Sequence, residues 1–330
     1  MSKKINWGIL GAGKIAGKFA RDLATLPDAN LYAVGSRNLA KAESFAEELG
    51  FQKAYGSYEQ LLQDLDLQIV YIATPHVFHC ENTLLCLQHK KAVLCEKPFA
   101  INSSEVQKMI ALSQDKNIFL MDALWTLYLP HILKTKAIVE SGELGALVSV
   151  RADFGFRADF SPESRLFDLN LGGGSLLDIG IYPALLSLFL LGKPQKVTAA
   201  AKIGTTGIDE ECAVFLEYAS GQTANLHSSL LARTPTEAYI YCEKGYIHIP
   251  TRFHERVDKV TILTYENLEE TVIPFDYQVT GYAYEAAEAM KCLKAGAIES
   301  NLVPHQFSLD LMGLLDEIRR QIGLVYPKHD

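Results

Sequence analysis

Residues 1–120 of the 330-residue chain alternate short apolar runs with longer amphipathic stretches, and this alternation limits the possible folds more than any other feature. The apolar runs are typical of strands buried on both faces, and they are Ile5–Leu10, Asn30–Val34, Gln68–Ala73, Ala92–Cys95 and Ile118–Met121. Helical patterns lie between them, at residues 15–25, 39–49, 76–89 and 103–115. Strands that alternate with helices predict an α/β domain built on a parallel, doubly wound sheet.

The pattern changes from about Leu144 onward. Strand-like segments now follow one another, several of them separated by Gly-rich or charged turns, and they are Val148–Phe156, Val197–Gly204, Cys212–Tyr218, Thr223–Leu231, Ala238–Cys242, Tyr246–Ile249 and Val260–Tyr265. The helical segments here are Ser175–Leu191, Tyr282–Ala295 and Gln306–Ile322. This mixture predicts an α+β domain with a large, mostly antiparallel sheet and helices on one face. Since Leu124–Glu143 is a helical connector, we expect domains at residues 1–124 and 125–330.

Composition excludes several classes of protein. The chain carries 31 Lys plus Arg against 39 Asp plus Glu, a net charge of −8, which argues against a nucleic-acid partner. The longest apolar run, Ile179–Leu191, falls short of the roughly 20 residues that a membrane span needs, so we expect no membrane partner. The six cysteines are scattered, with neither a CxxC pair nor zinc-site spacing. They predict reduced, buried thiols in a cytoplasmic protein without a metal site.

A glycine-rich turn, Gly11-Ala12-Gly13-Lys14-Ile15-Ala16-Gly17, directly follows the first predicted strand and opens a helix. Such a turn leaves the backbone bare, so that a pyrophosphate can approach the amides at the positive N-terminus of the helix. We therefore predict a Rossmann-type dinucleotide site at Gly11, Gly13, Lys14, Ile15 and Ala16. The alternative is a plain strand-to-helix turn, because glycine turns are common.

The end of the second strand, Val34-Gly35-Ser36-Arg37-Asn38, bears on the choice of cofactor. An NAD site usually has an acid here for the ribose hydroxyls, whereas NADP sites often use an arginine for the 2′-phosphate. This segment has no acid, so Ser36 and Arg37 predict NADP, with NAD as the alternative. The alternative is that Arg37 is only a solvated arginine of this loop.

Three polar segments follow at predicted carboxyl ends of strands, where a cofactor crevice opens in such a sheet. In the first, Thr74 is a good N-cap and Pro75 a good first helical residue, which puts His76 and His79 on one face. The second is Glu96-Lys97-Pro98. In the third, Asp178 and Tyr182 share a face only if the helix is continuous, and Pro183 should bend or start it there. Taken singly, these residues could also be surface, cap or core positions.

Together the early Gly-x-Gly, Ala73-Thr74-Pro75, Glu96-Lys97-Pro98 and Gly173–Tyr182 resemble the motifs of the glucose-fructose oxidoreductase/inositol dehydrogenase (Gfo/Idh/MocA) family. The resemblance covers essentially the whole chain and is greatest to the branch of the dimeric dihydrodiol dehydrogenases. It implies an NAD(P)-dependent dehydrogenase or reductase that transfers a hydride between the nicotinamide and a carbinol. The substrate would be a trans-dihydrodiol, an aldose or another sugar or polyol.

The resemblance also implies roles for particular residues. Lys97 would act at the nicotinamide and the reacting oxygen, Tyr182 as the acid/base, favoured as phenolate by that positive charge, and Asp178 as an orienting group. Thr74, His76, His79 and Glu96 would line the nicotinamide side, and a histidine is the rival base. The substrate pocket would hold Trp125 and Phe154. Where a further tryptophan is expected, this chain has Phe253 and His254, so we expect Phe253 in the pocket.

Two other functions compete with this one: an NAD-dependent inositol or sugar dehydrogenase, and a dinucleotide-binding sensor without catalysis. The absence of an acid near Arg37 argues against the first, and the joint presence of Lys97, Asp178 and Tyr182 against the second. Alternating segments such as Val148–Phe156 leave one face of the second sheet to be covered. Relatives cover it by pairing sheets between subunits, so the resemblance implies a homodimer.

Overall fold

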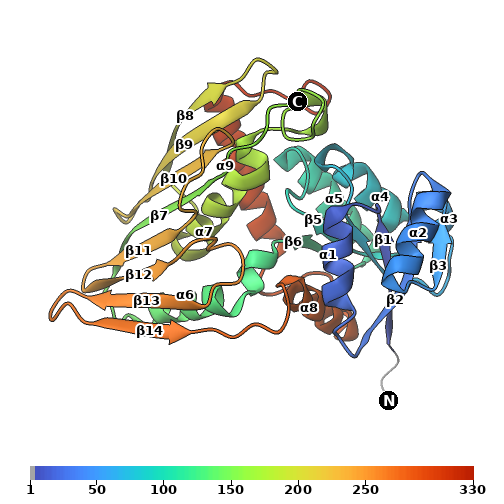
Figure 1. Cartoon of the computed structure of the whole chain (residues 1–330), viewed down its shortest axis with the longest axis horizontal. Coiled ribbons are helices and arrows are strands. Elements are labelled where there is room, and N and C mark those ends of the chain that lie inside the picture. Colours follow the sequence, from blue (N-terminus) through green and yellow to red (C-terminus); the bar gives the residue numbers. More distant parts are fainter. Residues whose placement is uncertain (1–3) are drawn as a thin grey trace. The chain divides into compact units, whose positions relative to one another are not determined.

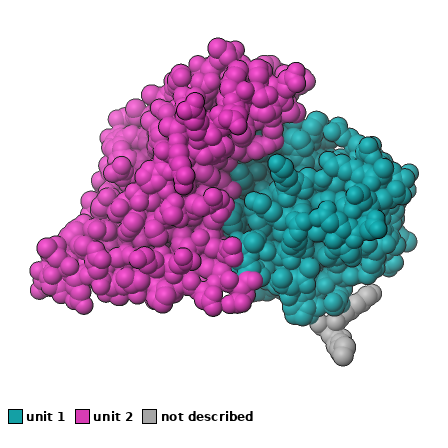
Figure 2. Space-filling view, viewed as in Figure 1, with its two compact units in different colours: residues 1–125, 279–309 teal, residues 126–278, 310–330 magenta. Residues whose placement is uncertain are grey.

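The computed structural model describes residues 4–330 and divides into two compact units (Figure 2). Unit 1 contains residues 1–125 and 279–309, and unit 2 contains residues 126–278 and 310–330. Residues 279–309 therefore depart from the predicted division at residue 124, which assigned them to the second domain. Helix α8 (Tyr282–Lys294) explains the difference: the backbone N–H groups of Thr280, Gly281 and Ala283 donate to the buried carboxylate of Asp22, at distances of 3.1, 2.8 and 3.2 Å.

Unit 1 is built on a six-stranded parallel sheet in the order β3-β2-β1-β4-β5-β6 (Figure 1). The strands are β1 (Ile5–Leu10), β2 (Ala29–Gly35), β3 (Lys53–Tyr55), β4 (Ile69–Ile72), β5 (Ala92–Glu96) and β6 (Leu120–Ala123). The helices between them are α1 (Lys14–Leu23), α2 (Leu39–Leu49), α3 (Tyr58–Leu62), α4 (His79–Gln88) and α5 (Ser103–Lys116). This confirms the doubly wound Rossmann sheet, whose strand order reverses at β1 and β4, where such folds bind dinucleotides.

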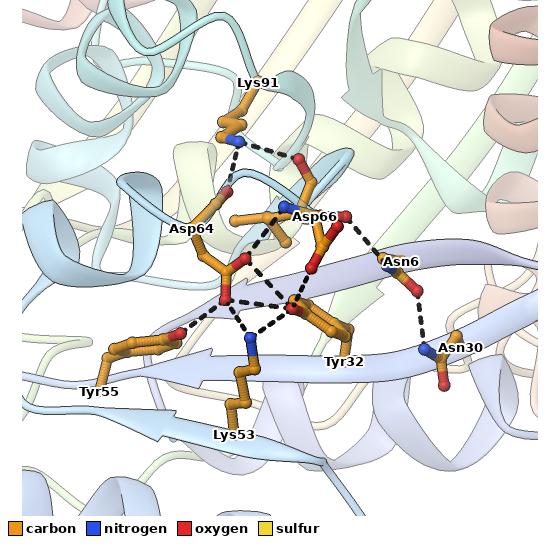
Figure 3. Close-up of polar contacts among 9 residues, drawn as sticks. Asn6, Asn30, Tyr32, Lys53, Tyr55, Asp64, Asp66 and Lys91 are labelled. Atoms are coloured by element: carbon orange, nitrogen blue, oxygen red, sulfur yellow. Dashed lines mark hydrogen bonds and ion pairs between the residues drawn. The ribbon is translucent and has the colours of Figure 1, made fainter.

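Strand β3 was missed by the sequence analysis because it has three residues and little apolar character. A polar cluster around Asp64 holds it in place (Figure 3). The Asp64 carboxylate accepts hydrogen bonds from Lys53 Nζ at 2.7 Å and from the hydroxyls of Tyr55 and Tyr32 at 2.6 and 3.1 Å. Tyr32 lies on β2, so these side-chain contacts add to the backbone pairing of β3 with β2 and join the loop before β4 to the same strands.

Unit 2 is built on an eight-stranded sheet in the order β14-β13-β12-β11-β7-β10-β9-β8. All neighbours are antiparallel except β7 and β10, so the prediction of a mostly antiparallel sheet is confirmed. The strands are β7 (Leu147–Gly155), β8 (Lys196–Ile203), β9 (Asp209–Glu217), β10 (Thr223–Ser229), β11 (Ala238–Cys242), β12 (Gly245–Ile249), β13 (Lys259–Thr264) and β14 (Glu270–Pro274). The last was missed because it is an exposed, polar edge strand.

Helices cover one face of this sheet: α6 (Pro130–Ser141), α7 (Ile181–Leu191) and the part of α9 (His305–Ile322) that belongs to unit 2 (Figure 1). Gln321 near the end of α9 bonds to the backbone of β8, and Lys136 of α6 donates to the carbonyl of Phe189 in α7. No helix of unit 2 crosses the opposite face, where β7 to β10 border a groove of about 500 Å³.

The most apolar helical stretch is longer than the sequence indicates. A short turn at Leu169–Leu171, a π-helical turn at Leu176–Gly180 and α7 together give a stretch, Leu169–Leu191, that is long and apolar enough to cross a membrane. The expectation that no run reaches that length was therefore wrong. However, 89% of its apolar window is buried inside the protein, as in the core helix of a globular unit, so the stretch is weak evidence for a membrane span.

Candidate active site

In the glycine turn after β1, the backbone of Gly11 lies close to the backbone that follows β4. Gly11 has a φ of +98°, and a Cβ at this position would lie 2.8 Å from the carbonyl oxygen of Ala73, which follows β4. Gly13 caps α1 in an extended conformation, no side chain caps this end, and the first turn of α1 contains no acid. The amides that open α1, at Lys14, Ile15 and Ala16, therefore fit a dinucleotide pyrophosphate.

A cavity of about 240 Å³ in unit 1 begins beside the end of β2. Arg37 is exposed and lines it, with its guanidinium carbon 5.7 Å from the ring centre of Phe78. The other lining residues include Ser57, Tyr58, Thr74, Pro75 and Asn82. Ser36 is instead buried, and its hydroxyl accepts a hydrogen bond of 3.3 Å from the backbone N–H of Asn38. Of the predicted pair, Arg37 is thus the one that borders the cavity.

The segment after β4 differs from the prediction. Pro75 precedes a 3₁₀ turn at His76–Phe78, and α4 begins only at His79, so Thr74 is not the N-cap of the helix. Pro75 has an extended ψ of 150°, so helical backbone begins only at His76, with the 3₁₀ turn, after β4 has ended at Ile72. The Thr74 hydroxyl instead accepts a hydrogen bond of 3.1 Å from the amide of Asn82.

His79 joins two loops. It is fully buried, with Nε2 2.8 Å from the carbonyl oxygen of Thr74 and Nδ1 2.8 Å from that of Pro98. Carbonyl oxygens only accept, and a neutral imidazole has a single N–H, so both contacts are hydrogen bonds only in the doubly protonated ring. This geometry favours a positioning role for His79, and its role as the rival base stays a prediction. His76 is also buried, with its ring centre 5.8 Å from that of His79.

A cluster of acidic groups surrounds the end of β5. Glu96 is buried and accepts hydrogen bonds from the Tyr71 hydroxyl and from the backbone N–H of Lys97, while Lys97 itself is half-buried. Asp122 on β6 and Glu285 on α8 are buried too, and burial together with the charge of Glu96 holds their pKa values well above the usual range. The sequence analysis missed Tyr71, Asp122 and Glu285 as site residues, although an acid between apolar neighbours marks both acidic positions.

In unit 2, three aromatic rings meet at the start of α7. The ring of Tyr182 lies 4.6 Å from that of His254 and 5.7 Å from that of Phe154, and Phe154 and His254 stack at 4.2 Å. Asp178 lies in the π-helical turn before α7, where its carboxylate accepts a hydrogen bond of 2.8 Å from Arg165. The sequence predicted a bend or a helix start at Pro183, and the structure has a π turn immediately before α7 instead. Asp178 and Tyr182 are therefore not spaced as in one regular helix.

Side chains of His131 and Thr126 hold the backbone of the loop that carries His254. His131 Nε2 lies 2.8 Å from the carbonyl oxygen of Phe253, and the Thr126 hydroxyl donates to that of His254 at 2.8 Å. The Phe253 side chain is fully buried, and its neighbour His254 is the residue whose ring lies beside that of Tyr182. Trp125 belongs to unit 1, where its ring stacks on that of Tyr282 at 4.7 Å.

Titratable groups do not gather into a metal site: within residues 4–330, no three His, Cys, Asp or Glu side chains are arranged to hold a metal ion. All six cysteines are buried and none forms a disulfide.

Comparison with known proteins identifies the class. An oxidoreductase family with an NAD-binding Rossmann fold matches residues 5–123, and the Gfo/Idh/MocA C-terminal domain matches residues 132–248. The chain belongs to the Gfo/Idh/MocA oxidoreductase family, and it is an NAD(P)-dependent dehydrogenase or reductase.

Among its relatives, proteins named trans-1,2-dihydrobenzene-1,2-diol dehydrogenase from Mus musculus and Danio rerio are each 37% identical over 331 residues, covering 98% of both chains. The fold is also that of an aldose-aldose oxidoreductase from Caulobacter crescentus solved with glycerol. That structure has a TM-score of 0.88 at 23% identity, over 97% of each chain.

Proposed function

We propose that the protein is an NADP-dependent dehydrogenase acting on the carbinol of a trans-dihydrodiol, an aldose or a polyol. The observation that carries the cofactor preference is Arg37, a cation bordering the cavity at the end of β2 where no acid stands between Val34 and Asn38. A guanidinium there suits a 2′-phosphate, and the acid that usually accepts from the two ribose hydroxyls of NAD is missing from the end of β2, although Glu59 and Glu81 also line the cavity. The substrate class is supported by the names of the relatives at 37% identity.

In this proposal the chain's own residues bind the cofactor and the substrate, orient them and transfer a proton. When bound, the nicotinamide supplies the acceptor or donor of the hydride. In oxidation, the C–H bond of the carbinol breaks with its electron pair, and the hydroxyl proton passes to the oxygen of Tyr182 as the C=O bond forms. A free tyrosine titrates near 10, so Tyr182 needs nearby positive charge to take up that proton near neutral pH. We assign this electrostatic part to Lys97, and the orientation of the Tyr182 segment to Asp178 with Arg165.

The test combines substrates and variants. Purified protein is mixed with NADP⁺ or NAD⁺ and a trans-dihydrodiol, D-xylose or a polyol, and formation of the reduced cofactor is followed by absorbance. We expect turnover of at least one substrate with NADP⁺ preferred, and a loss of roughly 100-fold or more in kcat for Tyr182→Phe, in line with the usual contribution of a general acid or base. Full kcat in Tyr182→Phe together with a large loss in His79→Gln would show that the histidine is the base.

We further propose that two copies pair through the open face of the eight-stranded sheet. Aromatic side chains gather on it: Tyr239 and Tyr241 stack at 5.7 Å, and Tyr246 and Tyr265 continue the row. The groove of about 500 Å³ bordered by β7 to β10 lies on the same face. Such a surface is typical of an interface between subunits. Light scattering during gel filtration should give the mass of a dimer, and Tyr241→Asp should shift it toward the monomer; a wild-type monomer would contradict the pairing.

A further inference from the structure

We propose that His254 acts through Tyr182: the proton on its imidazole sets how readily the phenol of Tyr182 gives up its own proton. His254 is thus a positioning residue for the acid/base step. This inference rests on the proposed function of Tyr182.

The contact between the two side chains is direct. The ring centres of His254 and Tyr182 lie 4.6 Å apart, with an angle of 41° between the ring planes. The ring of Phe154 stacks on that of His254, with a distance of 4.2 Å between the ring centres. His254 is 3% exposed, so little water screens a charge on the imidazole from the phenol. A positive charge at this distance stabilises a phenolate, and its loss removes that stabilisation.

The loop also contains the groups that govern the proton on His254. Nε2 of His254 lies 3.7 Å from Oε1 of Glu255, and Arg252 donates two hydrogen bonds to the same carboxylate, at 2.8 and 2.6 Å. Burial acts to raise the pKa of Glu255, but the nearby His254 and the hydrogen bonds from Arg252 outweigh it and lower the pKa to about 2. Glu255 is therefore ionised near neutral pH, and its charge favours the imidazolium form of His254.

Another titratable group packed against this loop is His131 on α6. Burial lowers the pKa of His131 to about 4, so the ring is neutral near neutral pH. Arg252 stays charged throughout. His131 and Arg252 therefore keep a constant charge near neutral pH, whereas an imidazole is the side chain whose ordinary titration range lies there.

The two protons on His254 and Tyr182 are therefore coupled. Loss of one proton gives a mixture of a neutral pair and an ion pair of imidazolium and phenolate, and the ion pair supplies a base below the ordinary titration range of tyrosine. Without the imidazole, the phenolate forms only at higher pH. A phenylalanine at position 254 preserves the ring contacts and removes the charge.

The experiment is the pH profile of kcat for oxidation of the substrate found active, in wild type, His254→Phe, His254→Asn, Tyr182→Phe and the double variant Tyr182→Phe/His254→Phe. His89→Phe is the matched control, because His89 is a half-buried histidine at the end of α4, outside the aromatic cluster. Thermal unfolding checks that each variant is folded, and His254→Asn keeps the test available should the phenylalanine variant fail to fold.

We expect His254→Phe and His254→Asn to move the rise of kcat upward by about one pH unit, which is about a tenfold loss at a pH below the rise. In the Tyr182→Phe background the second substitution should add no further loss. A His254→Phe profile that superimposes on wild type, while Tyr182→Phe is inactive, would overturn this inference alone. Full activity of Tyr182→Phe would instead overturn the proposed acid/base, so the two failures are distinguishable.

Discussion

The carboxylate of Asp209 accepts a hydrogen bond of 2.7 Å from the backbone N–H of Leu176, the first residue of the π-helical turn that precedes α7 and its Tyr182. The Ser175 hydroxyl donates to the same oxygen at 2.7 Å. A Cβ on Gly174 would overlap the other carboxylate oxygen, so only glycine allows this approach. Asp209, at the start of β9, therefore holds the helical stretch to the sheet. Burial raises its pKa to about 7, even though its hydrogen bonds act to lower it.

Asp209→Ala should destabilise the fold by about 1–3 kcal/mol, because two buried donors lose their acceptor. Asp209→Asn keeps an acceptor and should cost less. The wild-type carboxyl holds a proton in the folded state between about pH 4 and 7 that the unfolded state has lost, so its contribution to stability falls as pH rises through that window. Chemical denaturation at about pH 5 and about pH 8 should show this fall in wild type and a smaller one in Asp209→Asn. Equal pH dependence would contradict the assignment.

Asp64 predicts the opposite pH dependence. Burial raises its pKa, but hydrogen bonds from Lys53, Tyr55, the Asp66 backbone and Tyr32 outweigh it, so the pKa is lowered to about 2. The stabilisation is thus present above about pH 4 and is lost as pH falls toward 2. Asp64→Asn should lower the melting temperature at neutral pH and reduce the acid sensitivity. Unchanged acid unfolding in the variant would count against the cluster in Figure 3.

Glu285 is buried, and neither of its carboxyl oxygens has a hydrogen-bond partner. Glu285→Met removes that unsatisfied group from the interior and should raise the melting temperature, with a gain on the order of 1 kcal/mol. Glu288, one turn along α8, is the matched control, since it accepts hydrogen bonds from Ser300 at 2.9 Å and Lys291 at 3.0 Å. Glu288→Met should destabilise. If both substitutions lower the melting temperature alike, Glu285 is more than an unpaired buried acid.

The two glycines of the nucleotide turn should respond differently to alanine. Gly11→Ala forces a side chain toward the Ala73 carbonyl at a φ of +98° and should cost about 1–2 kcal/mol in stability. A Cβ on Gly13 meets nothing within 4 Å, so Gly13→Ala should leave the melting temperature unchanged. It should still weaken binding of the dinucleotide, because the pyrophosphate must approach that backbone. Calorimetric titration with NADP⁺ checks this, and undiminished affinity would place the pyrophosphate elsewhere.

Arg37→Ala should raise the Kd for NADP⁺ by about 10- to 100-fold, the loss expected for a hydrogen bond to a charged group, and change the Kd for NAD⁺ little. Arg21→Ala serves as control, since Arg21 pairs with Glu48 on the surface of unit 1 and does not line the cavity. Equal weakening of both cofactors would show that Arg37 does not contact the 2′-phosphate.

Local patterns predicted most of the fold. Five of the six strands in unit 1 are apolar runs: β1, β2, β4, β5 and β6. Because such strands are buried on both faces, nearly every position is apolar and the run can be recognised in the sequence. Strands β3 and β14 lack such a run. Polar contacts with Asp64 help to hold β3, and β14 lies at an exposed edge, so neither strand needs to be apolar on both faces. The membership of α8 in unit 1 was also missed, since it depends on the carboxylate of Asp22 far away in the chain.

The sequence by itself determined the features that local backbone and short motifs carry: the doubly wound sheet, the bare helix N-terminus after Gly13, and Arg37 in place of an acid. Only the tertiary structure decided that His254 rather than Phe253 lies against Tyr182, and that Tyr71 bonds to Glu96. The physical reason is that these contacts join residues distant in the chain. The position of His254 also depends on how its loop is held, here by His131 and Thr126, and no periodicity records that.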